Sequence, residues 1–136
     1  MAFSSKITAT GSYLPEKIVT NDDLAKKVDT SNEWIIARTG IRQRHISGEN
    51  ELTSDISYKA AKNLLESSKI KAEDIELIIL ATTTPDLTFP ATATTVQAKL
   101  GATKAFAFDI QAVCSGFVFA VSTANNFIKS GQVKNA

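Results

Sequence analysis

The stretch FAFDIQAVCSGFVFA, residues 106–120, decides the fold that we expect for this chain. Its first part predicts a strand over residues 105–110, and its last part begins an apolar helix that we place at about residues 115–130. Asp109 is the one formally charged residue between positions 105 and 128. We therefore expect the strand and the helix to be buried inside a larger body.

Further elements alternate along the chain on both sides of this stretch. The run IELIILAT, residues 75–82, predicts a strand buried on both faces, and a helix over residues 91–100 ends at Gly101. The remaining expected elements are a strand over 7–13, a helix from Thr20 to Val28, a helix over 31–39 that stops at Gly40, a strand over 42–46 and a helix capped by Thr53 or Ser54. Alternating strands and helices indicate an α/β fold with a largely parallel sheet.

Two capping patterns and one apolar stripe support the predicted helices. Thr20 with Asp23, and Thr30 with Glu33, have the spacing of a capping box. In the helix after Thr53 the apolar residues fall on one face, and we expect that face to lie on a sheet. The stripe consists of Ile56, Ala60, Ala61, Leu64 and Leu65.

Composition excludes several classes of function. Lys and Arg total 15 against 14 Asp and Glu, so no strong field attracts nucleic acid or an anionic membrane. No apolar run approaches the roughly 20 residues that span a bilayer, and we expect a cytoplasmic protein. A single Cys and a single His exclude an internal disulfide and a metal-ligand cluster, so no metal site is expected.

Cys114 is the candidate nucleophile. The predicted strand-turn-helix places it at a helix N-terminus, where the dipole and unpaired N–H groups favour a thiolate and stabilise an oxyanion. Gly116 permits a close approach of backbone or substrate. The alternative is a buried, small, inert side chain. His45, the only histidine, is either the catalytic partner of Cys114 or a structural residue of a strand, and its spacing from Cys114 favours the structural role.

Five runs occur together in an order and at a spacing that resemble β-ketoacyl-acyl carrier protein synthase III. They are TGSYLP, VDTSNEWIIARTGIRQRHI, LATTTPDLTFPATA, FDIQAVCSGF and IKSGQVKNA, and they cover nearly all of the chain. The resemblance implies a thiolase-like fold, of which residues 1–136 form the N-terminal half of a two-half α/β/α/β/α layered arrangement. It implies that the second half is absent from this chain and that the segment alone is inactive.

The resemblance also implies a reaction and its partners. Cys114 accepts an acetyl or other short acyl group from acyl-coenzyme A, which is a substrate and not a cofactor. The acyl-enzyme then condenses with malonyl-acyl carrier protein, loses carbon dioxide and initiates fatty acid synthesis. Members of the family are usually homodimers, and their His and Asn partners for the cysteine lie in the second half.

Residue by residue, the resemblance assigns four substrate-binding positions. Trp34 matches the aromatic residue that stacks on the adenine of coenzyme A, and Arg38 and Thr30 match residues near the same nucleotide. At i and i+4 on a helix, an indole and a guanidinium also suit a planar base with phosphates. Phe89 matches a loop residue that reaches the partner's acyl pocket. The alternatives are a surface cation–π pair for Trp34 and Arg38, a half-buried core position for Trp34, and a core plug for Phe89.

Two other functions are kept as alternatives. A thiol-redox protein would also use Cys114, but it needs an accessible thiol, and the apolar neighbours Ala112, Val113, Phe117 and Val118 argue against one. A non-catalytic nucleotide-binding module lacks support because neither G-x-G-x-x-G nor G-x-x-x-x-G-K-[ST] occurs.

Overall fold

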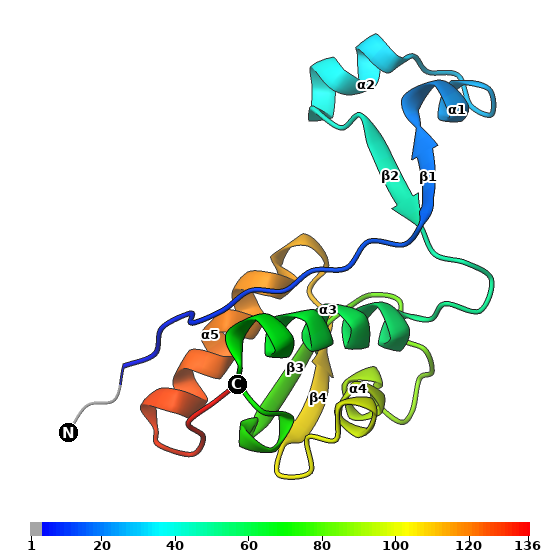
Figure 1. The fold of residues 1–136 in the computed structure, drawn as a ribbon. Coiled ribbons are helices and arrows are strands. Elements are labelled where there is room, and N and C mark those ends of the chain that lie inside the picture. Colours follow the sequence, from blue (N-terminus) through cyan, green and yellow to red (C-terminus); the bar gives the residue numbers. More distant parts are fainter. Residues whose placement is uncertain (1–3) are drawn as a thin grey trace. The chain divides into compact units, whose positions relative to one another are not determined.

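A computed structural model describes residues 4–136, which form two compact units (Figure 1). The smaller unit, Leu14–Glu51, contains β1 (Lys17–Thr20), α1 (Asn21–Ala25), α2 (Asn32–Thr39) and β2 (Gln43–Ile46). The larger unit combines the residues up to Tyr13 with Leu52–Ala136. It contains α3 (Thr53–Ser68), the 3₁₀ turn η1 (Ala72–Asp74), β3 (Leu77–Ala81), α4 (Thr92–Leu100), β4 (Phe106–Ile110), the 3₁₀ turn η2 (Val113–Ser115) and α5 (Gly116–Lys129).

The smaller unit is organised around one buried amide. β1 and β2 pair antiparallel, with Thr20 opposite Gln43, and Asn21 follows at once with only 1% of its surface exposed. Its Nδ2 donates to the Asn32 side chain at 3.1 Å and to the Ile41 carbonyl at 2.8 Å, while its Oδ1 accepts from Arg44 Nη2 at 2.8 Å. This side chain of α1 therefore joins α2 and β2, and Arg44 extends the connection to β1 by donating to the Val19 carbonyl at 3.2 Å. Satisfied bonds offset the cost of burying the amide.

The predicted capping box of α1 is confirmed. The Thr20 hydroxyl accepts from the Asp23 N–H at 3.1 Å, and the Asp23 carboxylate accepts from the Thr20 N–H at 3.2 Å. The Lys26 ammonium and then the Thr20 hydroxyl, both bonded to that carboxylate, lower the pKa of Asp23 to about 2. The helix itself ends at Ala25, short of the predicted Val28. After it the chain forms a turn, in which the Lys27 and Val28 N–H groups both donate to the Leu24 carbonyl.

The second predicted capping box is wrong by one residue. Ser31, and not Thr30, caps α2, since the Ser31 hydroxyl accepts from the Trp34 N–H at 3.1 Å. Thr30 instead has a buried hydroxyl oxygen with no hydrogen-bond partner among the described residues. The end of the helix is as predicted, because Gly40 adopts the left-handed conformation with φ of 71°.

The larger unit has a parallel sheet at its centre, which confirms the predicted α/β class. β3 and β4 run parallel, with Leu77 opposite Phe106 and Ala81 opposite Ile110. α4 packs on both strands and α5 packs on β3. Leu77 is fully buried, but Ala81 is exposed, so the prediction of a strand buried on both faces holds only at its start.

α3 packs on a helix, and the prediction that its apolar stripe lies on a sheet is wrong. Its main packing partner is α4, which lies beside it in Figure 1. Lys99 of α4 donates to Ser54 Oγ at 3.0 Å and to Asp55 Oδ1 at 2.6 Å in the first turn of α3. The hydrogen bond from Lys99 is the main cause that lowers the pKa of Asp55. Neither Thr53 nor Ser54 is the N-cap, which is Leu52.

The predicted strand over residues 7–13 is also absent from the structure. This segment is extended without a strand partner, and the Ser12 carbonyl accepts from the Asn63 side chain of α3 at 2.9 Å. A Cβ at Gly11 would lie 2.5 Å from Leu64 Cβ and 2.6 Å from the Ala60 carbonyl oxygen. The segment thus lies directly against α3, where only glycine fits.

α5 exposes much of its apolar surface, as expected for a helix that needs covering on every side. Phe117 is 72% exposed and Val118 is 63% exposed, and Phe119 and Val121 are exposed too. The opposite side carries Phe127, whose ring packs edge-on against Phe106 at 5.3 Å between centroids. The face of α5 that turns away from β3 is therefore an unpartnered apolar surface within the described residues.

We predict that Gly11→Ala destabilises the protein by about 3 kcal/mol, because the added methyl overlaps the backbone and a Cβ of α3. Gly48→Ala is the matched control, since its Cβ meets nothing within 4 Å, and we expect a change within about 0.5 kcal/mol. Urea denaturation of both variants measures the difference. Equal midpoints would show that the segment does not depend on contact with α3.

Candidate active site

Cys114 lies in a turn at the carboxyl end of the parallel sheet. The chain leaves β4 at Ile110, passes through η2 (Val113–Ser115) and enters α5 at Gly116. Cys114 is the middle residue of η2, so it precedes the α-helix by a single 3₁₀ turn instead of opening it, a small shift from the predicted position. Its side chain is exposed, and the alternative of a buried, inert cysteine is wrong for this structure.

Two backbone features force the sharp turn around Cys114. Val113 has φ of 47°, a left-handed conformation that a β-branched residue rarely adopts and that concentrates at functional sites. Gly116 is buried, and a Cβ there would lie 3.0 Å from Ala81 Cβ at the end of β3. The close approach expected at Gly116 is thus made by strand β3, which holds the start of α5 against the sheet.

The N-terminus of α5 is free to bind an anion. Ser115 caps the helix without any side-chain hydrogen bond, and no acidic residue occupies the first turn. The Ser115 and Gly116 N–H groups donate to the Ala112 and Val113 carbonyls within η2, so the helix start offers the turn with Cys114 the positive end of its dipole. Such an arrangement favours a thiolate and can stabilise the oxyanion formed when a carbonyl is attacked.

The apolar neighbours do not shield the thiol. Val113 is 75% exposed and Phe117 is 72% exposed, so the sequence argument that apolar flanks bury Cys114 is wrong for the described residues. These side chains instead form an apolar surface beside an accessible sulfur. Such a surface suits an uncharged acyl chain next to the nucleophile.

Asp109 positions the strand end that leads to Cys114. Its two carboxylate oxygens each accept a 2.7 Å hydrogen bond, one from the Thr92 N–H and one from the Ala93 N–H. The acid therefore caps α4 from β4. Asp109 stands out in the sequence as the lone charge in an apolar stretch, but the sequence alone does not predict that it binds the start of α4.

Trp34 and Arg38 form the pair that their spacing predicted. The Arg38 guanidinium carbon lies 5.4 Å from the centroid of the Trp34 ring, within the range of a cation–π interaction. Trp34 is 57% exposed, so it is a surface residue and not a half-buried part of the core. Thr30, with its unpaired hydroxyl, precedes the same helix. All three residues lie in the smaller unit, whereas Cys114 lies in the larger unit.

Phe89 is the most exposed large apolar residue of the loop between β3 and α4, at 86%. The alternative in which it plugs the core of its own domain is therefore wrong for the described residues. An exposed aromatic ring on a loop is available to a surface outside the chain.

His45 has the structural role that its spacing favoured. In β2, its Nδ1 lies 2.6 Å from the Pro15 carbonyl oxygen, a hydrogen bond within the smaller unit. This bond orients the ring and engages one of its two nitrogens.

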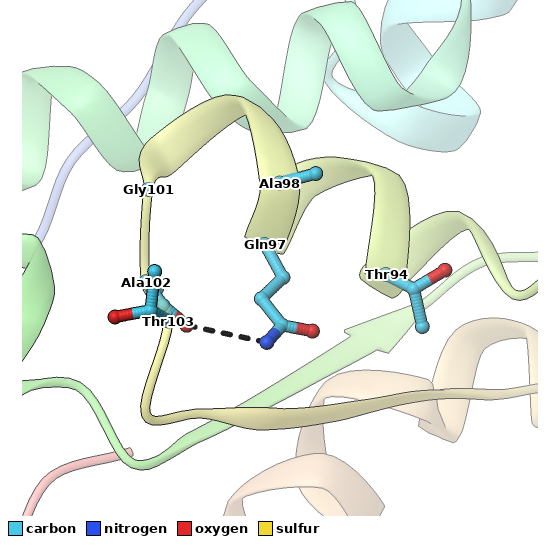
Figure 2. Close-up of a pocket in the computed structure, with 6 residues that line it drawn as sticks. All are labelled: Thr94, Gln97, Ala98, Gly101, Ala102 and Thr103. Atoms are coloured by element: carbon cyan, nitrogen blue, oxygen red, sulfur yellow. Dashed lines mark hydrogen bonds between the residues drawn. The ribbon is translucent and has the colours of Figure 1, made fainter.

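A further pocket lies away from the cysteine. It has a volume of about 240 Å³ and is lined by residues at the end of α4 and by the turn before β4 (Figure 2). The Gln97 side chain donates from its wall to the Ala102 carbonyl at 3.2 Å and to the Ala105 carbonyl at 2.6 Å. This pocket lies near the amino ends of the parallel strands, whereas Cys114 follows their carboxyl ends, so the two sites are at opposite ends of the strands.

Neither a metal site nor a membrane span is found in the part of the chain that the structure describes. Residues 4–136 contain no group of three or more His, Cys, Asp or Glu side chains suited to a metal ion. No helix among them is both long enough and apolar enough to cross a membrane.

Comparison with known proteins gives consistent matches. The family model of 3-oxoacyl-[acyl-carrier-protein (ACP)] synthase III matches residues 108–136, the segment that contains Cys114. A β-ketoacyl-[acyl-carrier-protein] synthase III of Ehrlichia canis is 62% identical over 96% of the chain. The same-named protein of Neisseria gonorrhoeae is 61% identical over 97% of the chain. The chain spans 41% and 42% of the lengths of these two relatives.

Solved structures agree with the sequence matches. The 3-oxoacyl-[acyl-carrier-protein] synthase III of Aquifex aeolicus superposes with a TM-score of 0.87 at 52% identity, covering 93% of this chain and 41% of its own. The synthase III of Thermus thermophilus superposes with a TM-score of 0.88 at 43% identity, covering 95% and 40%. The fold is thiolase-like, as the sequence resemblance implied.

We predict that Gly116→Ala destabilises the protein by about 1 kcal/mol, because its Cβ would press on Ala81 while the gain in helix propensity offsets part of that cost. The same variant should change the rate at which iodoacetamide alkylates Cys114. Ser115→Ala is the control, since its side chain makes no cap bond and is exposed. An alkylation rate and a stability equal to those of the parent would contradict the close packing described here.

Proposed function

We propose, from its similarity along nearly its whole length to the N-terminal part of β-ketoacyl-[acyl-carrier-protein] synthases III, that this chain carries the nucleophile of such an enzyme. Cys114 attacks the thioester of acetyl-coenzyme A or another short acyl-coenzyme A. Its sulfur gains the acyl group, and coenzyme A leaves as the thiol. The single observation that carries the proposal is an exposed cysteine in the strained turn before α5, inside the segment that matches the family model.

The turn supplies the chemistry of the first step. As the thiolate attacks, negative charge develops on the carbonyl oxygen, and the positive end of the α5 dipole stabilises it in our proposal. The close contact of Gly116 with Ala81 keeps the start of α5 from moving during the reaction. The exposed rings and methyl groups of Phe117 and Val113 bind the apolar part of the acyl group.

Condensation is the second step in our proposal. The acyl-enzyme reacts with malonyl-acyl carrier protein, a new carbon–carbon bond forms, carbon dioxide leaves, and the cysteine is released with 3-oxoacyl-acyl carrier protein as product. This reaction initiates fatty acid synthesis. A histidine and an asparagine that assist it are expected outside residues 1–136, and the prediction that the segment alone is inactive follows from this.

The nucleotide of coenzyme A is proposed to bind to the smaller unit. Trp34 offers an exposed indole face for the adenine, and Arg38 beside it offers a positive charge for phosphate. Thr30 supports this assignment because its buried hydroxyl lacks a protein partner, which is costly unless a ligand or water provides one. We treat coenzyme A as a substrate, and the reaction as proposed needs no resident cofactor.

We further propose a cytoplasmic homodimer that binds neither nucleic acid nor membrane. In the described part of the chain β4 pairs only with β3, so its other edge is open to another strand. The exposed Phe89 loop is a second surface that a partner could contact. Phe89 would then contribute to the acyl pocket of that partner.

We predict that the protein as its gene encodes it gains the mass of one acetyl group after incubation with acetyl-coenzyme A. Cys114→Ala should gain none, since it lacks the nucleophile, and Ser115→Ala should be acylated normally. Intact-protein mass spectrometry measures this. A parent protein that stays unmodified by acetyl-coenzyme A but forms a sulfenic acid with peroxide would refute acyl transfer and support the thiol-redox alternative.

We also predict that Trp34→Ala raises KM for acetyl-coenzyme A by about 5- to 150-fold, the range expected when one stacked base is lost. The kcat should change little, because the indole does not touch the reacting atoms. Acetyl-pantetheine, which lacks the nucleotide, should show no such rise. Ile41→Ala, an exposed apolar residue of the same unit, is the control. Equal losses with both substrates would contradict a nucleotide site at Trp34.

A further inference from the structure

Asp86 differs from its neighbours in the loop between β3 and α4. From Thr83 to Pro90 every other residue is exposed, but Asp86 is half-buried. A carboxylate turned inward in a loop that is otherwise exposed requires hydrogen-bond partners. The carboxylate accepts from the start of one helix, and the backbone N–H of the same residue donates to the start of another.

The first partner is the start of α3. Asp86 Oδ1 accepts from the Ser54 N–H at 3.0 Å, and Ser54 is fully buried. A carboxylate on a first-turn N–H satisfies a donor that the helix cannot satisfy and also meets the positive end of its dipole. Next to it, the Thr53 hydroxyl donates to the Thr84 carbonyl at 2.6 Å. The part of the loop that follows β3 is thus bound to α3 at two residues, Thr84 and Asp86.

The second partner is the start of α4. The Asp86 N–H donates to Thr92 Oγ1 at 2.9 Å, and Thr92 is 1% exposed. The Thr92 N–H in turn donates to Asp109 of β4 at 2.7 Å. Asp86 therefore closes an arc from residue 86 to residue 92, and this arc is connected through Thr92 to the sheet.

Phe89 lies in the middle of that arc. Residues 87–90 are all exposed, and Phe89 is 86% exposed. Packing within the unit therefore does little to set where its ring points. The two ends of the arc set it instead, and Asp86 is the residue that ties those ends to each other and to α3.

We infer that Asp86 is a positioning residue for Phe89, and that it thereby determines which acyl groups the acyl pocket accepts. This inference rests on the proposed function, in which Phe89 borders that pocket. Loss of the carboxylate removes the bond to the Ser54 N–H and leaves the Thr53–Thr84 bond as the remaining tie between this part of the loop and α3 within the described residues. The ring then occupies several positions and no longer limits acyl length. Longer acyl groups are then accepted better, so the preference for acetyl over hexanoyl falls. The rate with the shortest substrate changes least, because it does not reach the ring.

The test compares acyl-coenzyme A substrates of increasing length on the complete protein. The measured quantity is the ratio of kcat/KM for acetyl-coenzyme A to that for hexanoyl-coenzyme A. Asp86→Ala should change this ratio by about tenfold, a typical discrimination for an apolar pocket, while the rate with acetyl-coenzyme A changes little. Asp86→Asn should restore most of the parental ratio, because the amide oxygen still accepts from the Ser54 N–H.

Asp55→Ala is the matched control for helix stability. Asp55 accepts from the N–H of Leu52, the N-cap residue of α3, at 3.0 Å, but its other partner is Lys99 and not the loop. It should lower the melting temperature as Asp86→Ala does and leave the acyl ratio unchanged. Equal ratios in all three variants and the parent overturn the inference, as does an Asp86→Asn protein with no recovery.

Failure of the inference is distinguishable from failure of the proposed function. If the parent forms no acyl-enzyme with any acyl-coenzyme A, the function itself is wrong. If the parent is acylated and Asp86→Ala keeps its acyl ratio, only the positioning role is wrong.

Discussion

The carboxylate of Asp109 is the interaction on which the larger unit depends. It accepts the Thr92 and Ala93 N–H groups, both at 2.7 Å, and so joins the end of β4 to the start of α4. A charged group in an apolar stretch is tolerated because the first-turn donors of a helix need an acceptor and favour an anion. These two bonds fix the last residues of β4 against α4, just before the chain enters the turn with Cys114.

The turn that carries Cys114 and the loop that carries Phe89 are both held in place by contacts with neighbouring elements. Val113 adopts a strained left-handed conformation, and Gly116 omits a side chain where Ala81 approaches. Strain of this kind persists only where surrounding contacts hold it. The turn with Cys114 lies between β4 and α5 and packs on β3 at Gly116. The loop with Phe89 is bound through Thr92 to the start of α4 and to β4.

Much of the organisation was predictable because it is local. The Thr20 capping box, the glycine ends at Gly40 and Gly101, and the Trp34–Arg38 pair all depend on residues within four positions of each other. Where the partner is distant, prediction failed. The segment over 7–13 has strand-like alternation but lies against Ala60 and Leu64 of α3. α3 packs mainly on α4, because a helix pattern does not specify its partner.

The sequence by itself determined the α/β class, the position of the nucleophile between a strand and a helix, and the family resemblance, since periodicity, caps and motifs are properties of neighbouring residues. Only the tertiary structure decided what Asp109 and Asp86 bind, why Gly11 must be glycine, and that the Thr30 hydroxyl has no partner within the described residues. The reason is physical. A hydrogen bond or a close contact depends on distances between chain segments that are far apart in sequence, and no local pattern encodes those distances.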